Sequence, residues 1–293
     1  MKLSFAVAAA IAPATAVAAP ALNHVYIVLD QKTFDALSAS LVVAHTLGRS
    51  DDGLPDYAPP PAATDRIFLR GKQTYLEVFA PKNRFGEPVG KVGIALGEDR
   101  RSDLEKLALR WRGWCGIGLR QDDVVWTRRS PPIPWYTSVQ CDETTTGDRL
   151  ALWAMTYRPE FARWQQAAGT GRAAILAPRA ASGQGLFDIT AVTLDLPPYL
   201  HRRVVAQLTR AGMAARKRTD RVDLIGAGWT LTLREVAGDA RLVSIAFALD
   251  RTCTVAAMLG SARWSSRADR ASLTFGDDQR LPVRDAGSSP CRD

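Results

Sequence analysis

The chain has 293 residues, of which 46% are hydrophobic and 23% charged, and its formal net charge is +8. This composition is typical of a folded protein with a substantial core and excludes an intrinsically disordered chain. The positive charge comes from arginines scattered along the sequence, without the aromatic–basic repeat that tracks nucleic acid. A nucleic-acid partner is therefore not expected.

The first 18 residues have the pattern of a secretory signal peptide. Lys2 forms a short positive region, Leu3 to Ile11 an apolar run, and Ala16-Val17-Ala18 a small-residue cleavage signal. Cleavage after Ala18 would remove one lysine and no acid, so the mature charge is +7 (8 − 1). Later segments contain no run of roughly 18 apolar residues, so no transmembrane segment is expected. We predict a periplasmic or secreted protein.

Residues 22–30 are predicted to form a strand that is covered on both faces. Alternate residues of a strand share a face, so His24, Tyr26 and Val28 are expected on one side together with Leu22. The odd-numbered residues are expected on the other side. His24 is the one imidazole in this apolar setting, and the whole chain contains 3 histidines.

Two strand–helix–strand units are predicted in the first half of the chain, from helical spacing and from alternation of apolar residues. The expected elements are a helix at 31–47, a proline-rich loop at 49–64, strands at 66–70, 73–79 and 91–96, a helix at 102–111, and strands at 124–127, 135–140 and 150–157. Six tryptophans fall in the second unit and are expected to be core or wall residues, with a binding platform as the alternative: Trp111, Trp114, Trp126, Trp135, Trp153 and Trp164.

A segment rich in Ala, Gly, Arg and Ser, 167–185, is interpreted as the connection between two domains. The second half is predicted to repeat the pattern. Its expected elements are a strand at 186–194, a helix at 198–212, a hairpin at 221–225 and 229–235, a strand at 241–249, a helical turn at 256–259 and a strand at 271–275.

The four cysteines form an even set without C-x-x-C spacing, which argues against a zinc site and favours disulfides in an exported protein. Four cysteines allow three pairings. We favour Cys115–Cys141 and Cys253–Cys291, because each pair lies within one local segment.

The repetition of strand–helix–strand units of about 50–70 residues is an internal repeat. Through it the chain resembles the vicinal oxygen chelate superfamily, which includes glyoxalase I, bleomycin-resistance proteins and extradiol dioxygenases. The residues that carry the resemblance are Leu22-Asn23-His24-Val25, Tyr75-Leu76-Glu77-Val78-Phe79 and Val92-Gly93-Ile94-Ala95-Leu96. The resemblance is strongest to a bacterial glyoxalase-like family of unknown function. It implies an α+β fold of repeated βαβββ-like modules in curved, cup-like mixed sheets, with one glyoxalase-like domain at 19–166 and a second at 186–293.

In metal-binding members of the superfamily, the first strand of a module supplies a histidine and the last a glutamate. His24 and Glu77 match these two positions, and together they would bind a divalent metal such as Zn, Fe, Mn or Ni. The corresponding position of the second unit is Gly93, and the region around Met155 to Tyr157 has no carboxylate. Two protein ligands are too few for a firmly held metal. The alternative is a hydrogen bond between His24 and Glu77, or a contact of Glu77 with solvent or with an arginine such as Arg70.

We therefore carry two hypotheses of different class. The first is an exported protein that binds a small molecule in a cup-shaped pocket without catalysis and without a cofactor. The second is a metal-dependent lyase, isomerase or dioxygenase that uses His24 and Glu77. The residues expected to line the pocket are Tyr26, Phe68, Arg70, Tyr75 and Phe79. The sequence identifies neither the ligand nor the oligomeric state.

Overall fold

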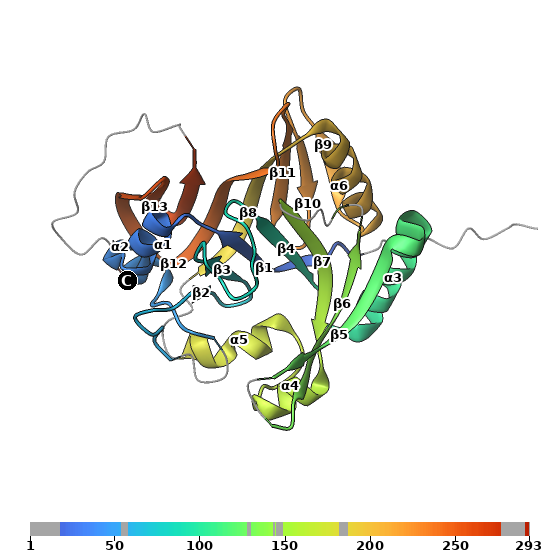
Figure 1. Cartoon of the computed structure of the whole chain (residues 1–293), viewed down its shortest axis with the longest axis horizontal. Coiled ribbons are helices and arrows are strands. Elements are labelled where there is room, and N and C mark those ends of the chain that lie inside the picture. Colours follow the sequence, from blue (N-terminus) through green and yellow to red (C-terminus); the bar gives the residue numbers. More distant parts are fainter. Residues whose placement is uncertain are drawn as a thin grey trace, which may run out of the picture.

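The computed structural model describes residues 18–53, 58–127, 130–142, 144, 149–181, 187–276 and 291–292. The predicted signal peptide up to Val17 lies outside these residues. The described chain forms two mixed sheets with helices packed against them (Figure 1). The predicted α+β class is confirmed.

The first sheet is built from two units that meet at its centre, where β1 and β4 pair in antiparallel fashion. In each unit the first strand pairs in parallel with the last, β1 with β3 and β4 with β7. The strand order is β2-β3-β1-β4-β7-β6-β5. The strands are β1 (Ala21–Val28), β2 (Arg66–Arg70), β3 (Tyr75–Phe79), β4 (Val92–Gly97), β5 (Leu119–Trp126), β6 (Ile133–Cys141) and β7 (Leu150–Tyr157).

The single helix expected at 31–47 is two helices, α1 (Gln31–Ser38) and α2 (Leu41–Leu47). Asp30 caps α1 by accepting from the Thr33 amide, and the Ser40 hydroxyl caps α2 by accepting from the Val43 amide. A serine that bonds to the backbone in this way starts a new helix more readily than it continues an old one. The second unit has one long helix, α3 (Arg101–Cys115), followed by a short 3-10 turn at Gly116–Gly118.

Strand β1 alternates as predicted only from His24 onward. Its pairing with β4 shifts register between Leu22 and His24, which marks a bulge. As a result Leu22 joins the main core with Val25 and Ile27, whereas the Asn23 side chain lies on the same side as His24. The predicted placement of Leu22 beside His24 is wrong for this reason.

The second sheet repeats the arrangement in the order β13-β12-β8-β11-β10-β9, with β14 paired to β12. The first strand of its strand–helix–strand unit, β8, again pairs in parallel with the last, β11. Helix α6 (Pro198–Arg210) packs against this sheet. The strands are β8 (Phe187–Leu196), β9 (Ala214–Lys217), β10 (Val222–Ile225), β11 (Thr230–Glu235), β12 (Arg241–Leu259), β13 (Ala262–Phe275) and β14 (Cys291–Arg292).

The helical turn predicted at 256–259 is wrong, because these residues continue strand β12. They pair with the start of β13 across a tight turn at Gly260, where φ is +66°. Cross-strand hydrogen bonds along β13 satisfy the backbone of this segment, whereas a single isolated helical turn is marginal in water. The preceding Thr254 and Val255 are β-branched and favour the strand.

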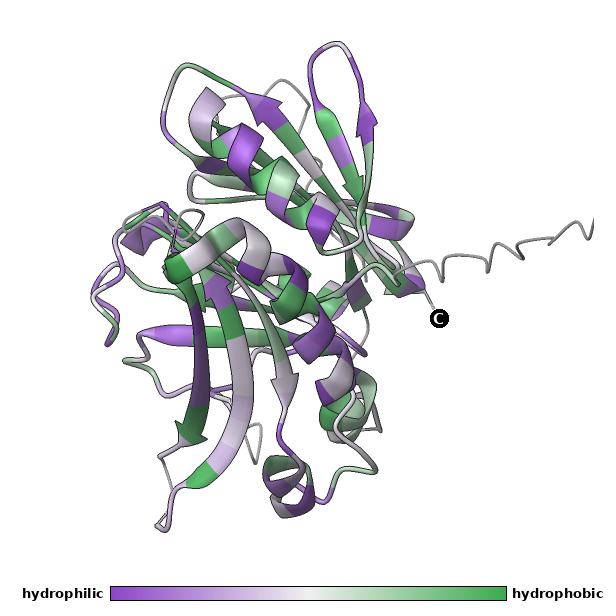
Figure 2. Cartoon of the chain, turned by 90° about the vertical axis from the view of Figure 1, so that its right-hand side faces the viewer, coloured by the Kyte–Doolittle hydropathy of each residue, from purple (hydrophilic) through white to green (hydrophobic). Residues whose placement is uncertain are grey.

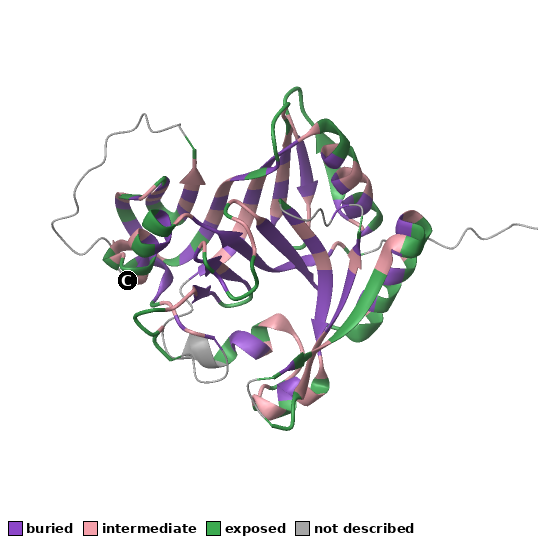
Figure 3. Ribbon diagram, viewed as in Figure 1, coloured by how far each residue is buried: buried purple, intermediate pink, exposed green. Residues whose placement is uncertain are grey.

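The two sheets share one large cluster of buried apolar side chains, which includes residues of β1, β4, β8 and β11 (Figure 3). Polar contacts also join them: the Asp188 carboxylate accepts from the amides of Gln73 and Thr74, and the Pro20 carbonyl accepts from the indole of Trp229. Helices α3 and α6 lie side by side on the outside (Figure 2).

Helices α4 (Pro159–Trp164) and α5 (Arg172–Ala181) follow β7, and α5 lies inside the segment interpreted as an inter-domain connection. The Leu176 side chain of α5 is buried against Phe68 and Tyr75 of the first sheet. The described part of 167–185 is thus folded onto the first sheet. Within the described residues, no helix is both long and apolar enough to cross a membrane.

Both expected disulfides are present. Cys115 at the end of α3 is bonded to Cys141 at the end of β6, and Cys253 of β12 to Cys291 of β14. The sequence separations are 26 and 38 residues. Two disulfides are typical of proteins of oxidising compartments outside the cytoplasm.

Removal of the second disulfide is expected to lower the free energy of unfolding by about 3–4 kcal/mol, because the bond restricts the unfolded chain. The measurement is urea denaturation of the double variant Cys253→Ser/Cys291→Ser against the oxidised wild type. Mild reduction of the wild type should produce a loss at least as large, since it opens both bonds. An unchanged unfolding midpoint in both experiments would contradict this expectation.

Candidate functional site

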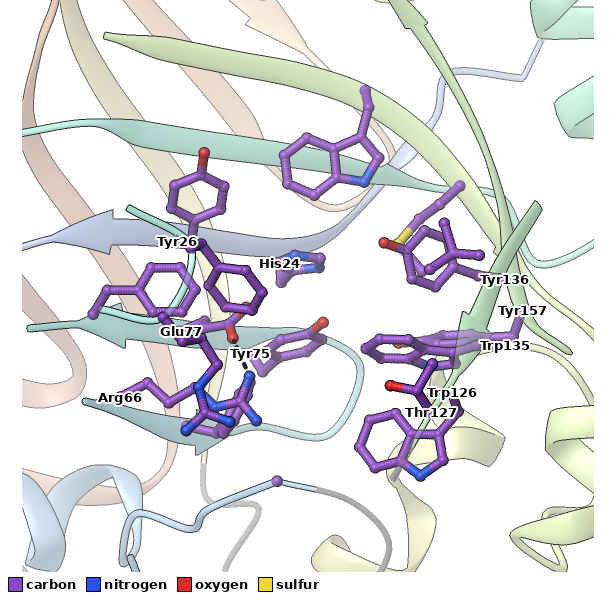
Figure 4. A pocket seen from close by; sticks show the side chains of 18 of the residues that line it. His24, Tyr26, Arg66, Tyr75, Glu77, Trp126, Thr127, Trp135, Tyr136 and Tyr157 are labelled. Atoms are coloured by element: carbon purple, nitrogen blue, oxygen red, sulfur yellow. Dashed lines mark ion pairs between the residues drawn. The ribbon is translucent and has the colours of Figure 1, made fainter. Parts of the chain in front are cut away.

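One face of the first sheet carries a cavity of about 510 Å³. Strands β1, β2 and β3 line one side of it, and β5, β6 and β7 the other (Figure 4). Ten of the 21 residues that line it are Phe, Tyr or Trp, so the walls are largely apolar with flat surfaces. We call this space the aromatic pocket.

The structure brings all seven residues singled out in the sequence to this pocket. They reach it from three adjacent strands because alternate residues of each strand share a face. The parallel pairing of β1 with β3 places His24 opposite Tyr75 and Tyr26 opposite Glu77. The seven are His24 and Tyr26 of β1, Phe68 and Arg70 of β2, and Tyr75, Glu77 and Phe79 of β3.

His24 is held as a neutral ring between aromatic neighbours. Its ring stacks on Tyr75, with 4.3 Å between ring centroids and 13° between planes, and meets the edge of Trp153. Its Nδ1 lies 2.8 Å from the Asn23 side-chain oxygen, which also accepts from the Tyr157 hydroxyl. Burial, together with the charge of Arg70, lowers the pKa of His24 to about 3.

Glu77 is a buried carboxyl group whose nearest cation is Arg66. Its Oε1 lies 3.9 Å from Nη1 of Arg66, beyond hydrogen-bonding distance. Burial raises the pKa of Glu77 to about 8, against the opposing charges of Arg70 and Arg84. The carboxyl group is therefore mostly protonated at neutral pH.

Among the described residues Glu77 has an arginine neighbour, as one of the alternatives held, but this arginine is Arg66 and not the Arg70 given as the example. His24 bonds to Asn23, and Arg70 pairs with Asp51 at 3.1 Å. Asp51 comes from the loop that joins α2 to β2, 19 residues before Arg70, and is fully buried.

The donor set does not fit a resident divalent metal. His24 and Glu77 are the superfamily-type pair, but the described residues contain no group of three His, Cys, Asp or Glu side chains that could surround an ion. The second unit offers Gly93 at the matching strand, directly opposite Tyr26 in the pairing of β1 with β4. A Cβ atom at Gly93 would lie 2.0 Å from the Tyr26 ring, so this ring covers the place where a second-module ligand would project.

The opposite wall of the pocket was not assigned to the site in the sequence. Trp126, Trp135 and Trp153 line it, together with Tyr136 and Tyr157. Phe161 of α4 is fully buried behind Trp126 and Trp135. Of the other tryptophans of the second unit, Trp111 is buried between α3 and α6.

Arg66 is one of the pocket residues that the sequence reasoning missed. It precedes Phe68 and Arg70 on β2 at intervals of two, so the alternation that places those two in the pocket also places Arg66 there. Its guanidinium lies over the Phe68 ring, with 5.1 Å from Cζ to the centroid. Strand alternation was the signal that could have found it.

Comparison with known proteins identifies the family. Residues 22–275 match a family of unknown function, DUF5829. The chain belongs to the DUF5829 family. That this family is glyoxalase-like stays a prediction. The comparison with curated proteins found no match.

Several solved structures are similar to this DUF5829 chain. A hypothetical protein from Staphylococcus aureus aligns with a TM-score of 0.52 at 8% identity, over 81% of this chain and 94% of the other. Catechol 2,3-dioxygenase aligns with a TM-score of 0.45 at 11% identity, over 94% and 96%. A variant of homoprotocatechuate 2,3-dioxygenase from B. fuscum aligns with a TM-score of 0.40 at 14% identity, over 76% and 56%. At these identities the similarity concerns the fold alone.

Proposed function

We propose that this DUF5829 protein binds a flat, mainly apolar small molecule in the aromatic pocket, without catalysis by a resident metal. The observation that carries the proposal is the pocket itself, about 510 Å³ in volume and walled by ten aromatic side chains. Ligand pockets of proteins have volumes of about 300–1,000 Å³ and combine apolar walls with a few polar groups. The carboxyl and guanidinium groups of the lining come from β2, β3 and the loop that follows β3.

The protonation states support binding more than acid–base chemistry. His24 is neutral over the physiological range, and burial raises the pKa of Tyr75 well above its usual value and that of Tyr136 to about 12. These groups offer fixed hydrogen-bonding atoms around a ligand. The cavity accommodates one molecule of about the size of a two-ring aromatic compound.

We further propose that the protein acts after export, in the periplasm or outside the cell. The disulfides at Cys115–Cys141 and Cys253–Cys291 support an oxidising compartment. The pattern of residues 1–18 supports cleavage after Ala18. The ligand would therefore be met outside the cytoplasm.

Naphthamide, an uncharged two-ring probe, is expected to bind with a stoichiometry of one and a Kd between about 10 µM and 1 mM. Trp153→Ala should weaken this binding about five- to tenfold, because the indole forms part of the wall beside His24 and Tyr26. The measurement is isothermal titration calorimetry.

The matched control is Trp114→Ala. Trp114 lies on α3 outside the pocket, against Arg210, and its removal should leave naphthamide binding unchanged. Absence of binding to the wild type, or equal effects of the two variants, would refute the proposed pocket.

A further inference from the structure

Three arginines line the aromatic pocket, and two of them are neutralised by their own aspartate. Arg70 pairs with the buried Asp51 at 3.1 Å. Arg84 donates two hydrogen bonds to the Asp65 carboxylate, at 2.9 and 2.7 Å. Each of these two guanidiniums thus already has a carboxylate partner, although both still act on the pKa of Glu77.

Arg66 differs from both. The residue is 8% exposed, and its Nε is buried without a hydrogen-bond partner among the described residues. Its ionic contact among the described residues is the long one to Glu77, at 3.9 Å. An unmade hydrogen bond of a buried cation is costly, so a group able to accept from this Nε would be bound strongly.

Among the three arginines of the pocket, Arg66 is the one whose ionic neighbour is a carboxyl group that stays mostly neutral at neutral pH, whereas Arg70 and Arg84 each have an aspartate. Burial keeps Glu77 mostly protonated below about pH 8, and Glu87, the other acid of the lining, pairs with Lys91. His24 and the phenol of Tyr26 stay neutral there as well, since burial lowers the pKa of the first and raises that of the second. The charged and titratable groups around Glu77 are Arg66 and Arg70 of β2, His24 and Tyr26 of β1, Tyr75 of β3, Arg84 and Glu87 of the following loop, Asp51, and Tyr136 of β6.

We propose that Arg66 binds the carboxylate of an aromatic acid, whose ring system lies between the aromatic walls of the pocket. The planar guanidinium can donate from Nε and one Nη to the two oxygens of a carboxylate, and a protonated Glu77 can donate a further hydrogen bond. A single arginine balances one negative charge, which favours a carboxylate over a doubly charged phosphate. This inference rests on the proposed function and names the ligand class of the same site.

The arrangement in Figure 4 agrees with this orientation of the ligand. Arg66 and Glu77 lie on one side of the pocket, and Trp126 and Trp135 on the other. Phe68, beneath Arg66, contributes a cation–π contact that holds the guanidinium in place. The acid group and the rings of one ligand would thus meet different walls.

The test compares naphthoate with naphthamide, which have the same shape and differ in charge. At about pH 6.5 the wild type should bind naphthoate at least about tenfold more tightly, as expected for a charge-assisted bond to a buried group. Arg66→Gln should remove this preference while naphthamide binding stays within about twofold. Arg149→Gln is the control, an arginine outside the pocket that pairs with Asp239 at 3.1 Å, and should retain the preference.

A second arm uses the wild type alone. As pH rises through about 8, Glu77 loses its proton and becomes the counterion of Arg66, so the preference for naphthoate should fall about tenfold by about pH 9.5. Naphthamide affinity should not change, and Glu77→Gln should hold the preference constant over this range. If naphthamide binds and naphthoate binds no more tightly at about pH 6.5, the carboxylate site is refuted and the pocket stands. If neither probe binds, the proposed function itself fails.

Discussion

Replacement of Glu77 by glutamine is expected to raise the free energy of unfolding by about 3–5 kcal/mol at about pH 9 and to leave it nearly unchanged at about pH 4. The cause is the buried carboxyl group, whose pKa rises from 4.5 to about 8 on folding. Between these values the unfolded chain has released the proton that the folded chain retains. Wild-type stability due to Glu77 is therefore lost as pH rises from about 4.5 to 8, and the variant avoids this loss.

The measurement is urea denaturation of wild type and variant at a series of pH values, with the difference between them plotted against pH. Glu160→Gln is the control, because Glu160 is an exposed glutamate of α4. A hydrogen bond from its own amide, followed by the hydrogen bond from Arg158, lowers the pKa of Glu160. The difference in unfolding free energy between Glu160→Gln and the wild type should therefore change with pH in the opposite direction. If Glu77→Gln raises the free energy of unfolding by the same amount at all pH values, the assigned protonation state of the Glu77 carboxyl group is contradicted.

Trp111→Ala is expected to lower the free energy of unfolding by about 3–5 kcal/mol. The Trp111 side chain on α3 is fully buried, and its indole N–H donates to the backbone carbonyl of Gln207 on α6 at 3.1 Å. The substitution opens a cavity and removes the indole donor, whereas the carbonyl keeps its bond from the Ala211 amide. Trp111→Phe should cost less, about 1–2 kcal/mol, since most of the volume remains.

The same experiment tests the proposed division into two domains. Trp111 belongs to the first sheet's half and Gln207 to the second, and the buried cluster runs through both sheets. We expect one cooperative transition that shifts as a whole in Trp111→Ala. Trp114→Ala, on the same helix but only partly buried, should shift it by less than about 1.5 kcal/mol. Two separate transitions, of which one is insensitive to Trp111, would contradict a shared core.

Local sequence patterns were sufficient to predict many of the strands and helices. Period-two alternation identified β1, β2 and β3 and placed His24 with Tyr26 on one strand and Glu77 with its alternate neighbours on another, because successive side chains of a strand must point to opposite sides. The meeting of His24 and Glu77 was implied by the resemblance to the vicinal oxygen chelate superfamily. Apolar spacing and terminal glycine or proline located α3 and α6 within a few residues. The cysteine pairs followed from short sequence separations.

The errors came from strand pairing that the local sequence does not determine and, at Ser40, from competition between local hydrogen bonds. The strand at 256–259 depends on pairing with β13, and the break after α1 depends on which local hydrogen bond of Ser40 prevails. The bulge at Asn23 depends on the register with β4. A short segment has competing conformations of similar energy, and the tertiary partner decides between them.

For this DUF5829 chain, the sequence by itself determined the strand–helix–strand repeat, the faces of the strands and the set of residues that could meet in a pocket. The tertiary structure alone decided how charge is distributed in that pocket. It brought Asp51 to Arg70 and Asp65 to Arg84, and it left Arg66 beside a carboxyl group whose burial favours the neutral form. Periodicity specifies the side of a strand on which a residue lies, whereas ionisation depends on burial and on the distances to charges from other elements.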